Sequence, residues 1–96
     1  MAELRVCSAA ETEFTDALCW YAERSQLIAL EFEADFSESL TQICEYPERY
    51  PMLDERHRFF LMRRFPYQLI YRWTNEQIIV VAVAHNSRKP GYWTGR

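Results

Sequence analysis

The hydrophobic period of the chain changes once, at the proline-bracketed segment between Pro47 and Pro51, and this change constrains the fold most. Before Pro47, large apolar residues recur every three or four positions, as on one face of a helix. After Pro51, large residues alternate with others, as in a strand whose successive side chains point to opposite faces. The sequence therefore predicts helices in the first half and strands in the second, with a brief additional strand at residues 4–7.

Two helices are predicted before Pro47. Ser8 and Glu11 have the S-x-x-E form of a capping box, which would start the first helix. Ser25 is a candidate N-cap for the second, and Pro47 would break that helix. The predicted apolar face of the second helix consists of Ile28, Phe32, Phe36, Leu40 and Ile43. Two long helices with little between them favour an antiparallel helical hairpin.

Three strands are predicted after the proline segment, at residues 58–65, 67–73 and 78–84, which are rich in aromatic and β-branched residues. The resulting order, β-α-α-β-β-β, is typical of an α+β fold. We expect one domain over residues 1–96, in which the two-helix hairpin packs on one face of a small, twisted, mainly antiparallel sheet.

Side-chain alternation predicts which residues lie on the sheet face that the helices leave open. If Phe60 and Tyr67 face the helices, the open face carries Phe59, Leu61, Arg63, Ile70 and Arg72. Large apolar groups mixed with arginines are typical of a surface that binds a partner. The alternative is that loops or a second copy of the protein cover this face.

Charge is divided unequally along the chain. Residues 1–48 contain eleven acidic and two basic residues, whereas residues 49–96 contain nine basic and three acidic ones, so that the net charges are −9 and +6. Ten of the eleven basic residues are arginines, which favour planar, bidentate or stacking contacts. One interpretation is a basic working surface on an acidic scaffold, and the other is a pair of acidic helices that pack on a neutralising sheet.

The segment after the last predicted strand is the best candidate site. His85 titrates near neutral pH, Arg88 can bind phosphate bidentately, and Tyr92 and Trp93 can stack on bases. The alternative is a C-terminal tail whose Tyr92–Trp93 pair folds back into the core and leaves Arg88 solvated.

Other kinds of site have little support in the sequence. The three cysteines form no CxxC pair, which favours reduced, buried thiols in a cytoplasmic protein. No signal peptide opens the chain, and the longest apolar stretch, residues 78–84, is too short to span a bilayer. No glycine-rich phosphate loop or zinc-ligand spacing is present, so we expect no metal, cofactor or membrane partner.

Four motifs carry a resemblance to a known family: YPERYP at 46–51, RRFPYQLIY at 63–71, VAVAH at 81–85 and RKPGYW at 88–93. Together they resemble the RelE/ParE toxin superfamily over nearly the whole chain, in the same order of elements. The resemblance implies a small bacterial cytosolic toxin of a type II toxin–antitoxin module. It also implies an antitoxin whose C-terminal segment folds on the toxin, with a homodimer or a toxin–antitoxin hetero-oligomer as possible assemblies.

The resemblance implies one of two activities. RelE-like members cleave messenger RNA on the ribosome, with basic groups that stabilise charge and move protons. Here Phe59, Leu61 and Gln68 occupy positions where RelE itself has basic residues, and none of the three can supply a cation. If the protein is a ribonuclease, we expect its catalytic residues to be His85, Arg88, Tyr92 and Arg63.

ParE-like members lack the nuclease residues and poison DNA gyrase, and this sequence is nearer to them. We therefore expect a non-enzymatic inhibitor that binds gyrase and is neutralised by an antitoxin. The residues expected to contact the target or the antitoxin are Phe59, Leu61, Arg63, Ile70, Arg72, Arg88 and Trp93. The alternatives are the ribosome-dependent ribonuclease and a non-toxic binding module of the same fold.

Overall fold

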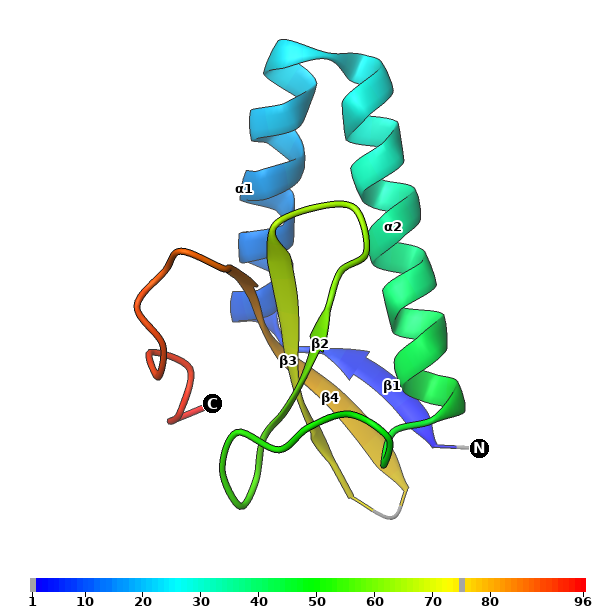
Figure 1. Cartoon of the computed structure of the whole chain (residues 1–96), viewed down its shortest axis with the longest axis vertical. Helices are drawn as coiled ribbons and strands as arrows, with labels where there is room; N and C mark the ends of the chain where they lie inside the picture. The colour runs from blue at the N-terminus through cyan, green and yellow to red at the C-terminus, as the bar shows by residue number, and fades with distance from the viewer. Residues whose placement is uncertain (1, 75) are drawn as a thin grey trace.

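The computed structural model describes residues 2–74 and 76–96. The elements follow one another as β1 (Glu3–Val6), α1 (Ser8–Arg24), α2 (Gln26–Glu45), β2 (Arg58–Leu61), β3 (Tyr67–Trp73) and β4 (Gln77–His85). Figure 1 shows α1 and α2 as an antiparallel pair that extends beyond one end of the sheet. The predicted α+β fold and its order of elements are confirmed.

The predicted start of α1 is wrong in its detail. The N-cap is Cys7, not Ser8, and no side chain caps the helix. The reason is the preceding strand, because the Cys7 N–H donates to the Val80 carbonyl at 3.0 Å and the chain turns directly from β1 into α1. Ser8 is therefore already the first helical residue.

The predicted limits of α2 are confirmed. Ser25 Oγ accepts a hydrogen bond from the Ile28 N–H at 3.3 Å, which satisfies one of the free amides of the first turn. The helix ends at Glu45, and the residue before Pro47 lies outside it, as the clash with a proline ring requires. Neither α1 nor α2 is long and apolar enough to cross a membrane, within the residues that the structure describes.

The strands form one mixed sheet in the order β1-β4-β3-β2. β1 runs parallel to β4, and the two other pairs are antiparallel, as the prediction of a mainly antiparallel sheet requires. β2 ends at Leu61, four residues before the predicted limit. The chain turns there because Met62 N–H donates back to the Tyr67 carbonyl at 3.0 Å, and buried Asp35 of α2 accepts the Arg64 N–H at 2.9 Å.

The main core lies between the helices and one sheet face. Phe32 and Ile43 of α2 are fully buried there, together with Leu69 and Tyr71 of β3. The Tyr71 hydroxyl donates to the Pro47 carbonyl at 2.7 Å, which fixes the proline segment to the sheet. Truncating a buried phenylalanine such as Phe32 to alanine costs about 3–5 kcal/mol, so this core carries much of the stability of so small a chain.

The opposite sheet face is not open, which corrects the prediction. Alternation does place Phe59 and Ile70 on this face, but Trp93 from the C-terminal segment packs over it. Ile70 is fully buried, Val81 is 1 % exposed and Trp93 is 6 % exposed. The alternative in which the Tyr92–Trp93 pair folds back into the core is therefore the one that the structure has.

Candidate functional site

The C-terminal cap, which we define as residues 86–96, covers the sheet face opposite the helices and lies beside β4 in Figure 1. Its backbone hydrogen bonds are turns and one bond to the β2–β3 turn, from the Asn86 N–H to the Pro66 carbonyl at 2.8 Å. Gly91 has φ of 94°, a left-handed conformation that favours glycine and that precedes the packed Tyr92 and Trp93. Side chains therefore hold most of the cap against the sheet.

Glu13 of α1 joins the cap to the outer edge of β4. β1 pairs only with residues 77–80, so the later part of β4 has no neighbouring strand on that side. There, the Val83 N–H donates to Glu13 Oε1 at 2.9 Å, and the Arg96 guanidinium donates to the Val81 carbonyl at 3.0 Å. Arg96 also contacts both Glu13 carboxylate oxygens at 3.1 Å, so the two side chains close the strand edge together.

Arg88 is paired inside the molecule. Its guanidinium lies 3.6 Å from a Glu13 carboxylate oxygen and 3.6 Å from the centre of the Tyr92 ring, a cation–π contact. The Arg88 side chain is 54 % exposed, so solvent weakens the ion pair without removing it. The positive charge of Arg88, which was expected to bind phosphate, is therefore partly neutralised by the Glu13 carboxylate.

The Tyr92 hydroxyl is buried under Arg88. Burial, with a further contribution from the Glu13 carboxylate, raises the pKa of Tyr92 to about 12. A group with such a pKa stays protonated at neutral pH and is poorly matched to proton transfer there.

His85 ends β4 and faces α1. Its Nδ1 accepts a hydrogen bond from the Ser87 N–H at 3.1 Å, and its ring lies edge-on to Tyr67 with centroids 5.0 Å apart. His85 and Arg88 line a cavity of about 470 Å³ between α1 and β4, opposite Glu13 and Asp16. We call this cavity the α1–β4 groove. It brings together two of the predicted site residues, with two carboxylates facing them.

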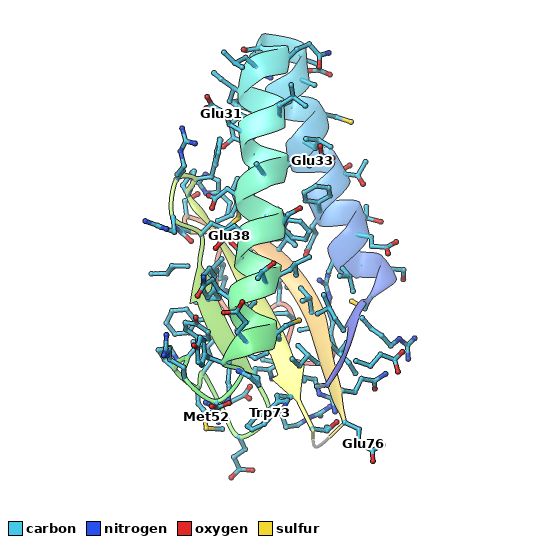
Figure 2. All side chains as sticks on the ribbon, turned by 90° about the vertical axis from the view of Figure 1, so that its right-hand side faces the viewer. Glu31, Glu33, Glu38, Met52, Trp73 and Glu76 are labelled. Carbon is cyan, nitrogen blue, oxygen red and sulfur yellow. The ribbon has the colours of Figure 1, made fainter. Side chains whose placement is uncertain are left out.

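Arg63 lies elsewhere, which corrects its predicted place on the open face. It is exposed in the turn after β2 and lines a different groove, beside Glu31 and Glu38 of α2. Figure 2 shows these two glutamates on the outer side of α2. Arg63 and Arg88 therefore do not form one basic surface, because each arginine lies against acidic residues of a different helix.

The remaining predicted contact residues differ in how accessible their side chains are. Leu61 is 56 % exposed on β2, and Phe59 is partly buried beside the cap. Arg72 donates to the Arg96 carbonyl at 3.2 Å and helps to hold the end of the chain. Ile70 and Trp93 are buried against each other, so neither can contact a partner while the cap is closed.

A further pair beneath the cap, buried His57 and exposed Asp54, was not predicted from the sequence. His57 is 1 % exposed, its Nδ1 lies 2.9 Å from Asp54 Oδ1, and its ring centre lies 4.9 Å from that of Trp93. Hydrogen bonds from the Arg56 and His57 backbone N–H groups and the His57 ring lower the pKa of Asp54. Only the three-residue spacing of Asp54 and His57 could have indicated the pair, and such spacing is common.

Glu13 was also missed, although the sequence contains a signal for it. Glu13 lies between Ala10 and Ala17 at helical spacing, and both alanines are buried against the sheet. A carboxylate inside the buried stripe of a helix needs hydrogen-bond partners, because an unpaired buried charge is costly.

The cysteine prediction is partly corrected: all three thiols are free, but Cys19 is exposed on α1.

Comparison with known proteins gives a family and a fold. The family model described as the ParE toxin of the type II toxin–antitoxin system, parDE, matches residues 4–90. Nine chains of solved structures match, and one comes from a structure titled "Chromosomal ParDE TA system from P. aeruginosa". That chain has a TM-score of 0.71 and 16 % sequence identity, and the alignment covers 88 % of this chain and 96 % of that one. No curated protein matches significantly.

Proposed function

The chain belongs to the ParE toxin family of type II toxin–antitoxin systems, and we propose that it arrests bacterial growth by binding DNA gyrase and is neutralised by a cognate antitoxin. The proposal describes inhibition by protein binding, without a chemical step. It follows from the family together with the state of the residues that a ribonuclease would need.

The observation that most directly supports protein binding over RNA cleavage is the contact of Arg88 with both Glu13 and Tyr92. RNA cleavage by attack of a 2′-hydroxyl needs a free cation at the phosphate and a group that exchanges protons near neutral pH. Here the Arg88 guanidinium is 3.6 Å from a carboxylate, and the Tyr92 hydroxyl beneath it has a pKa of about 12. Both features make Arg88 and Tyr92 poorly suited to RNA cleavage.

The separation of Arg63 from the other three residues supports the same conclusion. His85 and Arg88 line the α1–β4 groove, whereas Arg63 lines the groove beside α2. Asp16 also lines the α1–β4 groove with His85, and its negative charge would repel a phosphate backbone.

A protein target would meet side chains that remain accessible with the cap closed. Leu61 is exposed on β2, Arg63 is exposed in the turn that follows, and Arg88 is half exposed on the cap. Exposed arginines near an apolar side chain are typical of residues at protein interfaces. We propose these three as contacts to gyrase or to the antitoxin, together with the partly buried Phe59 and Arg72.

The test uses purified protein in two assays in parallel. In the first, DNA gyrase supercoils a relaxed plasmid in the presence of increasing toxin, and we expect supercoiling to stop. In the second, ribosomes with a bound message are incubated with the same preparation, and we expect the message to stay intact. Cleaved message with unaffected supercoiling would support the ribonuclease instead and contradict the proposal.

Neutralisation is tested in cells. Expression of the toxin alone should stop growth, and co-expression of the small protein encoded beside it should restore growth. Unimpaired growth without that protein would favour the non-toxic binding module. Growth arrest that the neighbouring protein leaves unchanged would contradict the antitoxin half of the proposal.

A further inference from the structure

The α1–β4 groove contains an exposed ring beside an unpaired carboxylate. Trp20 lines the groove and is 51 % exposed, which is unusual for so large an apolar side chain. Asp16 lies four residues earlier on α1, so the two side chains are neighbours on one helix face. Within residues 2–74 and 76–96, Asp16 forms no ion pair and no side-chain hydrogen bond.

Aromatic rings line both sides of this groove. α1 supplies Trp20 and Tyr21, and the sheet supplies Tyr67 and His85. The Tyr21 and Tyr67 ring centres are 6.5 Å apart, and the Tyr67 and His85 centres are 5.0 Å apart, so the rings form a continuous wall. The π faces of such rings attract a cation and give no comparable attraction to an anion.

The charge of the groove has the sign that attracts a cation. Arg88 and Arg96 both contact the Glu13 carboxylate, at 3.6 and 3.1 Å, whereas Asp16 has no ion pair among the residues that the structure describes. The one carboxylate of the groove that remains unmatched is therefore Asp16, which places a negative charge beside Trp20. The Asp16 carboxylate would repel a phosphate group here, and a guanidinium or ammonium group would find both that carboxylate and aromatic rings.

The chain already places its own arginines in surroundings of this kind. The Arg24 guanidinium lies 3.6 Å from the centre of the Trp20 ring, and the Arg88 guanidinium combines a ring, Tyr92, with a carboxylate, Glu13. Arg24 covers one face of the Trp20 ring but does not line the groove, and the ring is still 51 % exposed, so the cavity beside Asp16 stays open.

From these observations we propose that the α1–β4 groove binds an arginine or lysine side chain of the antitoxin, between Asp16 and the ring of Trp20. The inference rests on the proposed function for the identity of the partner. The charge of Asp16 and the aromatic rings of the groove indicate the kind of ligand. It is a cationic side chain on a protein and not a nucleic-acid phosphate.

The binding test uses N-acetyl-L-arginine amide, whose only charge is the guanidinium, and N-acetyl-L-citrulline amide, its uncharged isostere. Each is titrated into ¹⁵N-labelled toxin, and the Trp20 indole N–H and the Asp16 amide are followed by NMR. We expect saturable shifts with the arginine derivative and none with the citrulline derivative. Equal responses to the two compounds, or no saturable shift with either, would overturn the inference.

Variants test the two contacts separately. Asp16→Asn removes the charge and should weaken arginine binding about threefold, as for a solvent-exposed ion pair. Trp20→Ala removes the exposed ring and should weaken binding by a similar factor. Glu33→Gln, an exposed carboxylate on α2 visible in Figure 2, is the matched control and should leave binding unchanged. Asp16→Asn with unchanged affinity would contradict the site.

A short oligouridylate and the neighbouring-gene protein complete the design. Shifts at Trp20 and Asp16 with the oligouridylate but not with the arginine derivative would assign the groove to RNA. If gyrase inhibition and neutralisation hold while Asp16→Asn binds the neighbouring-gene protein as tightly as wild type, this inference fails and the proposed function stands. If the groove binds arginine while gyrase is unaffected, the proposed function fails alone.

Discussion

The Glu13 carboxylate of α1 and the Arg96 guanidinium at the end of the chain meet at 3.1 Å beside the outer edge of β4. Each side chain also bonds to the backbone of that strand, Glu13 to the Val83 N–H and Arg96 to the Val81 carbonyl. The pair therefore stands where a further strand would lie, and it anchors the C-terminal cap to the first helix. Several properties of the molecule depend on this contact.

Glu13→Gln tests the anchor. Glutamine can still accept the Val83 N–H, but it loses the charge that holds Arg96 and Arg88. We expect the free energy of unfolding to fall by about 1–2 kcal/mol, because Glu13 is largely buried and its bonds are charge-assisted. Urea denaturation measures the change, with Glu33→Gln as an exposed control that should stay within about 0.5 kcal/mol of wild type. An equal effect of both variants would contradict the anchor.

Trp93 should contribute more to stability than any other residue of the cap. Its side chain is 6 % exposed against Ile70 and His57, and truncating such a residue to alanine costs about 3–5 kcal/mol. Since that loss could unfold a small domain, Trp93→Phe provides a second variant with a smaller effect of the same sign. Trp20→Ala, at a half-exposed ring, is the control. A Trp93→Phe variant as stable as wild type in denaturant would show that the cap is not packed as described.

Tyr92 predicts a loss of stability in alkali. Its pKa is about 12 when folded and about 10 when unfolded, so the folded state holds its proton more tightly. The resulting stabilisation is complete below pH ~10 and is lost as the pH rises towards 12. Denaturation midpoints of wild type and Tyr92→Phe, compared at intervals over this range, check the effect. The wild type should lose stability more steeply, and parallel curves would contradict the burial of the hydroxyl.

Protonation of Asp54 should lower the stability of the protein in acid. Its pKa is lowered by hydrogen bonds from Arg56 and His57, so its stabilising effect is present above the ordinary pKa of 3.8 and is lost as the pH falls through the lower folded value. Asp54→Asn should therefore be less stable than wild type at neutral pH and approach it in stability at low pH. Thermal unfolding over that range makes the comparison. A constant gap between the two proteins would rule out the role of the charge.

Local signals explain how much of the fold could be predicted. Ser25 caps α2 through a bond to a residue three positions away, and Pro47 limits the same helix through its own ring. Both effects therefore depend on residues that are close together in the sequence. Strand alternation likewise assigns Phe59 and Ile70 to the correct sheet face. The shortened β2 was missed because its turn depends on Asp35, 29 positions before Arg64.

The site could be predicted only in part, for the same physical reason. His85 and Arg88 share a groove because three positions separate them at the end of one strand. The burial of Ile70 depends on Trp93, and the pairing of Arg88 depends on Glu13, 75 residues earlier. Such contacts form only when the whole chain packs, so the sequence could pose the alternatives of an open and a covered sheet face without choosing between them.

The most direct test of the central claim is the order in which macromolecular synthesis stops after the toxin is induced without its antitoxin. Incorporation of labelled thymidine and of labelled amino acids is followed in the same culture from the moment of induction. A gyrase inhibitor that cuts no RNA should stop DNA synthesis first, while translation continues and messenger RNA stays intact. Translation that stops first, with cleaved message on the ribosomes, would contradict the account.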